Sequence, residues 1–173
     1  IPFSHHIPTS MFSLALCKNS EPVVAVTYDP FIKRLLYTKK NAPSYMNKKE
    51  IHVRSGKFVS GEFIYGIPYW NKNFNANKYF SLVSEKKIKV TYVESIVYQS
   101  MLVATGISRA LVITAASPWD RAAAKMIIEN AGGICTDENG KRLTVFGNTQ
   151  YIIATNKEDH DEIMEIVQKC LHK

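Results

Sequence analysis

The sequence has no apolar run long enough to cross a membrane, and it has very few cysteines. A membrane-spanning helix needs roughly twenty consecutive apolar residues; no stretch of this chain approaches that length, and its first residues do not form a signal peptide. The cysteines Cys17, Cys135 and Cys170 are far apart, lack metal-site spacing and cannot all pair with one another. We therefore expect reduced thiols in a cytoplasmic protein, without membrane insertion or a disulfide framework.

Internal repeats, low-complexity tracts and long blocks of one charge are also missing. The 173 residues are 46% hydrophobic and 21% charged, which is typical of a globular chain that can bury a substantial core. A net charge of +7 favours anionic partners such as phosphorylated small molecules or nucleic acid. The lysines are spread along the chain, however, and no RNA-binding consensus surrounds them. Nucleic acid is therefore a weak alternative, and a solvated basic surface is the simpler account.

The first third of the chain alternates short apolar runs with turn residues. This pattern predicts strands over 9–17, 23–28 and 35–38, with a turn at 18–22, and therefore an antiparallel meander.

From about residue 58 the pattern changes to alternating strands and helices, which is typical of a mixed α/β layer. We place a subdomain boundary there, dividing the chain into 1–58 and 59–173. Strands are expected over 63–66, 88–92, 110–113, 133–136, 141–145 and 151–154. Besides the helix that begins at Ser117, helices are expected over 77–84, 94–105 and 157–171.

The stretch from Ser117 to Gly133 reads as a helix with both ends marked. Ser117 suits the N-cap, Pro118 suits the first helical position, and Asp120 completes a capping box. Gly132 or Gly133 can adopt the left-handed cap at the other end. A carboxylate at a helix start can cap the helix or bind a hard cation such as magnesium. These residues alone favour the structural cap.

Several stretches together resemble the inositol monophosphatase family, whose members are magnesium-dependent, lithium-sensitive phosphatases related to the fructose-1,6-bisphosphatases. Trp119-Asp120, Ala122-Ala123 and Ala131-Gly132-Gly133 are similar to the family's C-terminal signature, and residues 134–141 resemble the strand and turn that follow it. Upstream, residues 3–8 resemble the family's Asn-Phe-x-His-Gly-x-Pro stretch, and residues 23–30 its strand ending in Tyr-Asp-Pro. Residues 41–53 resemble the family's Gly-x-Gly-Ala-x-x-Asn-Gly hairpin but contain no glycine. The matches follow the family's order over nearly the whole chain.

The resemblance implies an α/β (α+β layered) fold, part of an α-β-α-β-α sandwich like that of the inositol monophosphatases and fructose-1,6-bisphosphatases. The family's Asp-Pro-x-Asp-Gly-Thr motif and its paired-glutamate motif, which carry most of the metal ligands, do not occur here. Ile1 stands where the residue just after the first motif would be. We therefore expect the C-terminal portion of the enzyme, acting as a homodimer or with the missing N-terminal half.

By the same resemblance, Asp120 is the catalytic metal ligand that this portion contributes, with Mg²⁺ as the cofactor. Glu94-Ser95-Ile96 stands where the family has Gly-Ser/Thr-Ala, so Ser95 and Glu94 are the candidate substrate-binding residues. The alternative for Glu94 is a structural role, as an acidic residue that the helix dipole favours in the first turn. Ile113 aligns with a glutamate that commonly contacts inositol in the family. Losing that polar contact should relax or redirect specificity.

We therefore expect magnesium-dependent hydrolysis of a small phosphate monoester by metal-activated water. The implied substrate is a small phosphorylated polyol or sugar, such as inositol monophosphate or fructose 1,6-bisphosphate. One alternative is a non-catalytic fragment or pseudoenzyme that binds an anionic partner. Another is a phosphatase of the same family that acts on 3′-phosphoadenosine 5′-phosphate.

Overall fold

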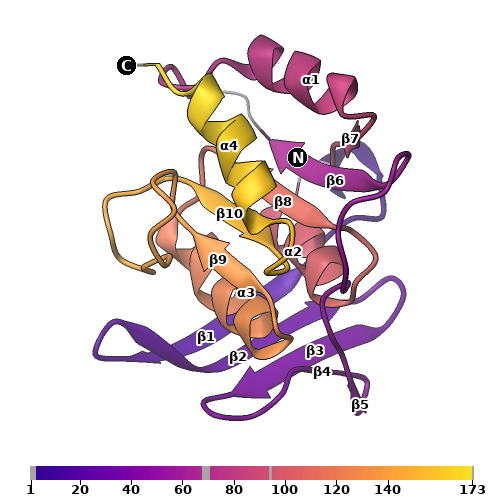
Figure 1. The fold of residues 1–173 in the computed structure, drawn as a ribbon. Coiled ribbons are helices and arrows are strands. Elements are labelled where there is room, and N and C mark those ends of the chain that lie inside the picture. The colour runs from indigo at the N-terminus through magenta and orange to yellow at the C-terminus, as the bar shows by residue number, and fades with distance from the viewer. Residues whose placement is uncertain (1–2, 68–70, 94, 173) are drawn as a thin grey trace.

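The computed structural model describes residues 3–67, 71–93 and 95–172, and it stacks two five-stranded sheets with helices between and outside them (Figure 1). From the bottom of Figure 1 upward, the layers are the first sheet, helices α2 and α3, the second sheet, and helices α1 and α4. This β-α-β-α order agrees with the layered α+β fold that the resemblance implies.

The first sheet is the antiparallel meander that the sequence predicts. Its strands pair in chain order and comprise β1 (Phe12–Lys18), β2 (Glu21–Asp29), β3 (Arg34–Lys39), β4 (Tyr45–Met46) and β5 (Lys49–Glu50). The predicted hairpin after β3 forms without glycine, because Asn47 and Lys48 adopt positive φ angles of 49° and 72°. Asn47 also ties this hairpin to β3, since its Oδ1 accepts a hydrogen bond from the Leu35 amide at 3.0 Å.

The second sheet is mixed. Its spatial order is β7 (Lys89–Thr91), β6 (Phe63–Ile67), β8 (Ala110–Ile113), β10 (Ile152–Thr155) and β9 (Ile134–Thr136). β6 is parallel to both β7 and β8, whereas β10 is antiparallel to its neighbours β8 and β9. The helices are α1 (Ala76–Glu85), α2 (Ile96–Ala104), α3 (Pro118–Asn130) and α4 (His160–Cys170), with a short 3₁₀ turn η1 at Phe3–His5. None of the helices in the described part of the chain combines the length and apolar character that spanning a membrane requires.

The predicted strand at 141–145 is wrong. In the structure this segment contributes only an isolated bridge between Thr136 and Arg142 and then leaves the sheet. Leu143 and Val145 are nevertheless only 1% exposed. The alternation that predicts a strand therefore comes from an irregular segment whose apolar side chains reach the core. Elsewhere the predicted elements are present with ends shifted by a few residues, and the subdomain division at residue 58 stays a prediction.

The core lies on both faces of the second sheet. Leu111 and Ile113 point from β8 into the cluster shared with α2, α3 and the first sheet. Their neighbours Ala110 and Val112 point into the cluster beneath α1 and α4. Both faces of β8 are thus covered, which explains its unbroken apolar sequence.

By contrast, the outer face of the first sheet is apolar and exposed. Phe12, Leu14 and Leu16 of β1 are 55%, 58% and 62% exposed. The strand register places Leu14 beside Val26, and Val26 beside Tyr37, so the apolar side chains continue across the sheet. A hollow of about 520 Å³ lies on this surface. The apolar outer face, as we call it, comprises Phe12, Leu14, Leu16, Val24, Val26, Leu35 and Tyr37.

Candidate functional site

The parallel strands of the second sheet bring the starts of two helices to one edge. Because β6 is parallel to β7 and β8, the C-terminal ends of all three strands lie along the same edge. β7 leads toward α2 and β8 leads toward α3, and the two helices pack against each other. Ser95 at the start of α2 and Asp120 in the first turn of α3 therefore share this edge, the place where open α/β sheets bind ligands.

Asp120 uses one carboxylate oxygen for the predicted helix cap. Its Oδ2 accepts a hydrogen bond from the Ser117 amide at 3.0 Å, while Oδ1 has no hydrogen-bond partner among the described residues. Burial raises the pKa of the half-buried Asp120 carboxyl, although the Ser117 amide and the Arg121 charge act to lower it. The positive end of the α3 dipole favours the ionised form at this position. One oxygen of Asp120 is thus available to a cation.

Arg121 supports this helix start from the side. No sequence pattern singles out Arg121, whose only local signal is its position next to the candidate ligand Asp120. The side chain of Arg121 is only 2% exposed, and Nη2 donates to the Gly147 carbonyl at 3.2 Å while Nη1 donates to the Thr149 carbonyl. The segment around residues 147–149 is thereby held beside α3.

Two further contacts fix the connection from β8 to α3. The Ala116 amide donates to the Gln150 carbonyl at 2.7 Å, and the Asn71 side-chain amide donates to the Thr114 carbonyl at 2.6 Å. Asn71 likewise has no local sequence signal, because its partner lies more than forty residues away in the chain. The backbone leading to Asp120 is therefore held from two sides.

Ser95 caps α2. Its Oγ accepts a hydrogen bond from the Tyr98 amide at 3.3 Å, and no described residue accepts one from the Ser95 hydroxyl. Gln99 holds the same turn, because its side-chain amide donates to the carbonyls of Val93 and Ser95. The Ser95 hydroxyl is thus oriented and has a proton to donate. Glu94, the other predicted substrate-binding residue, lies outside the described residues.

Ile113 is fully buried between the two sheets. Its side chain offers no hydrogen bond and cannot replace the glutamate that the resemblance places at this position.

The described residues fit only part of a metal site. Within residues 3–67, 71–93 and 95–172, no three or more His, Cys, Asp or Glu side chains gather closely enough to hold a metal ion. Magnesium prefers oxygen ligands, keeps several waters and is often held by one or two carboxylates. Asp120 lies in the first turn of a helix with one oxygen that accepts no hydrogen bond from a described residue, so it fits one position in such a coordination shell. It does not complete the shell.

Comparisons with known proteins identify relatives over nearly the whole chain. A model of the inositol monophosphatase family matches residues 2–172. A protein described as "Fructose-1,6-bisphosphatase/inositol-1-monophosphatase" from Thermotoga maritima is 26% identical over 173 residues, which are 100% of this chain and 66% of that protein. A protein from Aquifex aeolicus with the same description is 27% identical over 172 residues, covering 95% of this chain and 61% of that one.

The solved structure of a Thermotoga maritima IMPase superposes with a TM-score of 0.83 at 27% identity, covering 97% of this chain and 64% of that one. The chain therefore spans between 61% and 66% of the length of these relatives.

Proposed function

We propose, from the premise that this chain belongs to the inositol monophosphatase family, that it forms part of a phosphatase that hydrolyses small phosphate monoesters. The observation that carries the proposal is the placement of Asp120. One of its oxygens caps α3 and the other has no hydrogen-bond partner among the described residues, at the sheet edge where β6, β7 and β8 end. The descriptions of the relatives support inositol phosphates and fructose 1,6-bisphosphate as the substrate class.

In this proposal Asp120 gives one oxygen ligand to a divalent cation, with Mg²⁺ as the preferred ion. Such a cation, when bound, neutralises phosphoryl oxygens and activates water. Because no three potential ligand side chains gather among the described residues, we expect further ligands from another segment of the same protein or from a partner chain. The catalytic site is thus composite.

The other residues of this edge position the reactants. The Ser117 amide fixes the orientation of the Asp120 carboxylate, and Arg121 holds the neighbouring segment in place. The Ser95 hydroxyl donates a hydrogen bond to a sugar or polyol oxygen. Ile113 offers no acceptor for a substrate hydroxyl, so we expect little discrimination among related polyol and sugar phosphates.

The test is phosphate release, measured with magnesium and with a chelator. It uses the assembled protein, by which we mean this chain together with the segment or partner chain that supplies the remaining ligands. The substrate panel comprises inositol 1-phosphate, fructose 1,6-bisphosphate and 3′-phosphoadenosine 5′-phosphate. Asp120→Asn should abolish turnover. Asp161→Asn is the matched control, because Asp161 also lies in the first turn of a helix but its side chain is fully exposed in α4.

Turnover that needs magnesium and disappears only in Asp120→Asn supports the proposal, and the preferred substrate then defines the branch of the family. Turnover that survives Asp120→Asn would remove Asp120 from the site. An assembled protein that releases no phosphate from any of the three esters would favour a non-catalytic role.

A further inference from the structure

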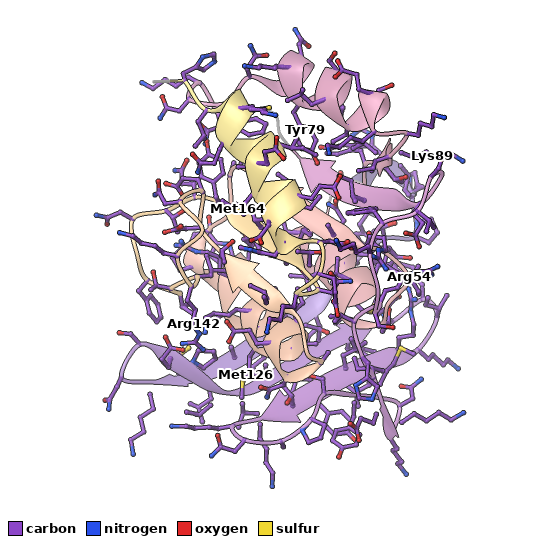
Figure 2. All side chains as sticks on the ribbon, in the orientation of Figure 1. Arg54, Tyr79, Lys89, Met126, Arg142 and Met164 are labelled. Atoms are coloured by element: carbon purple, nitrogen blue, oxygen red, sulfur yellow. The ribbon has the colours of Figure 1, made fainter. Side chains whose placement is uncertain are left out.

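A polar pocket lies toward the opposite end of α3 from Asp120. It has a volume of about 610 Å³ and is formed by the β1–β2 turn, the β3–β4 connection, the C-terminal half of α3 and the segment after β9. Figure 2 labels two residues that line it, Met126 from α3 and Arg142 from the segment after β9. Along the helix axis, Asp120 and Glu129 are about 13 Å apart. The pocket is therefore separate from the Asp120 edge.

A charge cluster forms one wall of the pocket. The side chain of Lys125 is only 1% exposed, and its Nζ lies 3.0 Å from Glu21 Oε2 and 3.1 Å from Glu129 Oε2. Arg142 pairs with the same two carboxylates, closely with Glu129 at 2.8 Å and loosely with Glu21 at 3.6 Å. Two cations thus balance two carboxylates.

Two further lysines leave the pocket with excess positive charge. Lys18 and Lys40 also line it, and neither has a carboxylate within ion-pair distance in the part of the chain that the structure describes. Four cationic side chains therefore face two carboxylates. An excess of positive charge in a concave site attracts anions from solution.

The negative end of the α3 dipole does not cancel this attraction. The carbonyls of the last helical turn already accept hydrogen bonds from the protein: Ile127 from the Ser44 hydroxyl at 2.7 Å, and Asn130 from the Ser44 amide at 3.2 Å. A helix end also carries only about half an elementary charge. The full charges of the side chains therefore set the sign of the potential in the pocket.

We propose that this pocket, bounded by Lys18, Lys40, Lys125 and Arg142, is a second anion site that binds the dianionic phosphate group of a small metabolite. Phosphate geometry suits the planar fork of Arg142, whose side chain is 65% exposed and can adjust. Glu21 is 47% exposed, so an entering phosphate can displace it from its loose contact with Arg142. The proposal does not depend on the catalytic role of Asp120.

The test uses the assembled protein with EDTA at low ionic strength, so that no divalent cation can hold phosphate at the Asp120 edge. Inorganic phosphate and ribose 5-phosphate are titrated separately by calorimetry. The variant Lys18→Gln/Lys40→Gln removes the two unpaired cations, and Lys57→Gln/Lys157→Gln removes the same charge from exposed lysines outside the pocket.

We expect one anion bound per chain, affinity at least tenfold weaker in the pocket variant, and unchanged affinity in the control. Arg142→Gln, at an exposed position, should also weaken anion binding, independently of the two lysines. Tighter binding of ribose 5-phosphate than of phosphate would identify an ester as the ligand, and equal binding would identify free phosphate. No binding, or equal weakening in the pocket variant and its control, would overturn the proposal. So would binding that is lost in Asp120→Asn.

Discussion

At the scale of single residues, one oxygen of Asp120 caps α3, and we propose that the other binds a cation. Asparagine keeps an oxygen that can cap α3 but loses the charge that a cation needs. Asp120→Asn should therefore leave the fold intact and weaken magnesium binding in the assembled protein by about tenfold or more. Trp119, which is 75% exposed and adjacent to Asp120, provides a fluorescence signal for the titration in a Trp70→Phe background. Unchanged affinity, or an equal loss in Asp161→Asn, would contradict the ligand role.

The buried phenol of Tyr79 gives a second prediction, which concerns stability. Tyr79 is 0% exposed, and its hydroxyl has no hydrogen-bond partner among the described residues. Tyr79→Phe removes this unsatisfied group and should stabilise the fold by about 1 kcal/mol at pH 7. Urea unfolding at pH 7 measures this difference, and a variant less stable than the wild type would reveal a partner for the hydroxyl.

The same residue predicts a dependence on alkaline pH. Burial raises the pKa of Tyr79 well above its ordinary value of 10.0. Above pH 10 the unfolded chain therefore loses this proton while the folded chain keeps it, so stability falls as the pH rises through that range. Tyr79→Phe should lose less stability between pH 9 and 11 than the wild type. Parallel unfolding curves for the two proteins over this range would refute the assignment.

At the scale of elements, Arg109 joins the connection between the sheets to the start of α4. Its guanidinium donates to the Ser55 carbonyl at 2.9 Å and pairs with Asp159, whose Oδ1 accepts from the Phe58 amide at 2.9 Å. Arg109→Met leaves the buried Asp159 carboxylate without its cation and should cost about 3–5 kcal/mol. Denaturant unfolding measures the loss. The double variant Arg109→Met/Asp159→Asn should recover part of it, and no recovery would mean that the two side chains act independently.

Local sequence signals predict the elements well where the relevant partners are close in sequence. Pro118 marks the start of α3, and Gly132, with φ of 87°, follows its end. Local sequence signals miss interactions with distant partners. Asp159 stands at the N-cap position of α4, but its side chain pairs with Arg109, which lies fifty residues earlier in the chain. The segment 141–145 alternates like a strand because two of its side chains fill the core, and nothing local shows that the sheet ends beside it.

The candidate site, too, could be predicted from the sequence only in part. Local pattern identifies Asp120 only as a helix cap, and the resemblance to a family is what makes it a candidate ligand. The parallel pairing of β6 with β7 and β8 then places Ser95 and Asp120 at one edge, which no periodicity in the sequence reports. Arg121 and Asn71 act through backbone carbonyls, which carry no sequence signal.

At the scale of the whole molecule, the apolar outer face predicts that this chain self-associates when it is isolated. Exposed apolar surface of this extent favours association in water. Changing Leu14 and Leu16 to lysine should raise the monomer fraction, because both side chains are more than half exposed and have no core to disturb. Sedimentation velocity of the wild type and the variant measures this, with Lys57→Gln as a surface control. A monodisperse wild-type monomer with a cooperative, high-temperature melt would contradict the prediction.

The layered arrangement also sets an order of events during synthesis. The strands β1, β2 and β3 pair with their neighbours in the chain, whereas the inner face of their sheet packs against α3, which is made much later. At about 5–20 residues per second, translating the chain from the end of β3 to the start of α3 takes roughly 4–16 seconds. Throughout that interval the nascent meander has two open apolar faces. Binding by a chaperone during that interval, or a change in the rate of translation ahead of α3, would therefore change the yield of folded protein.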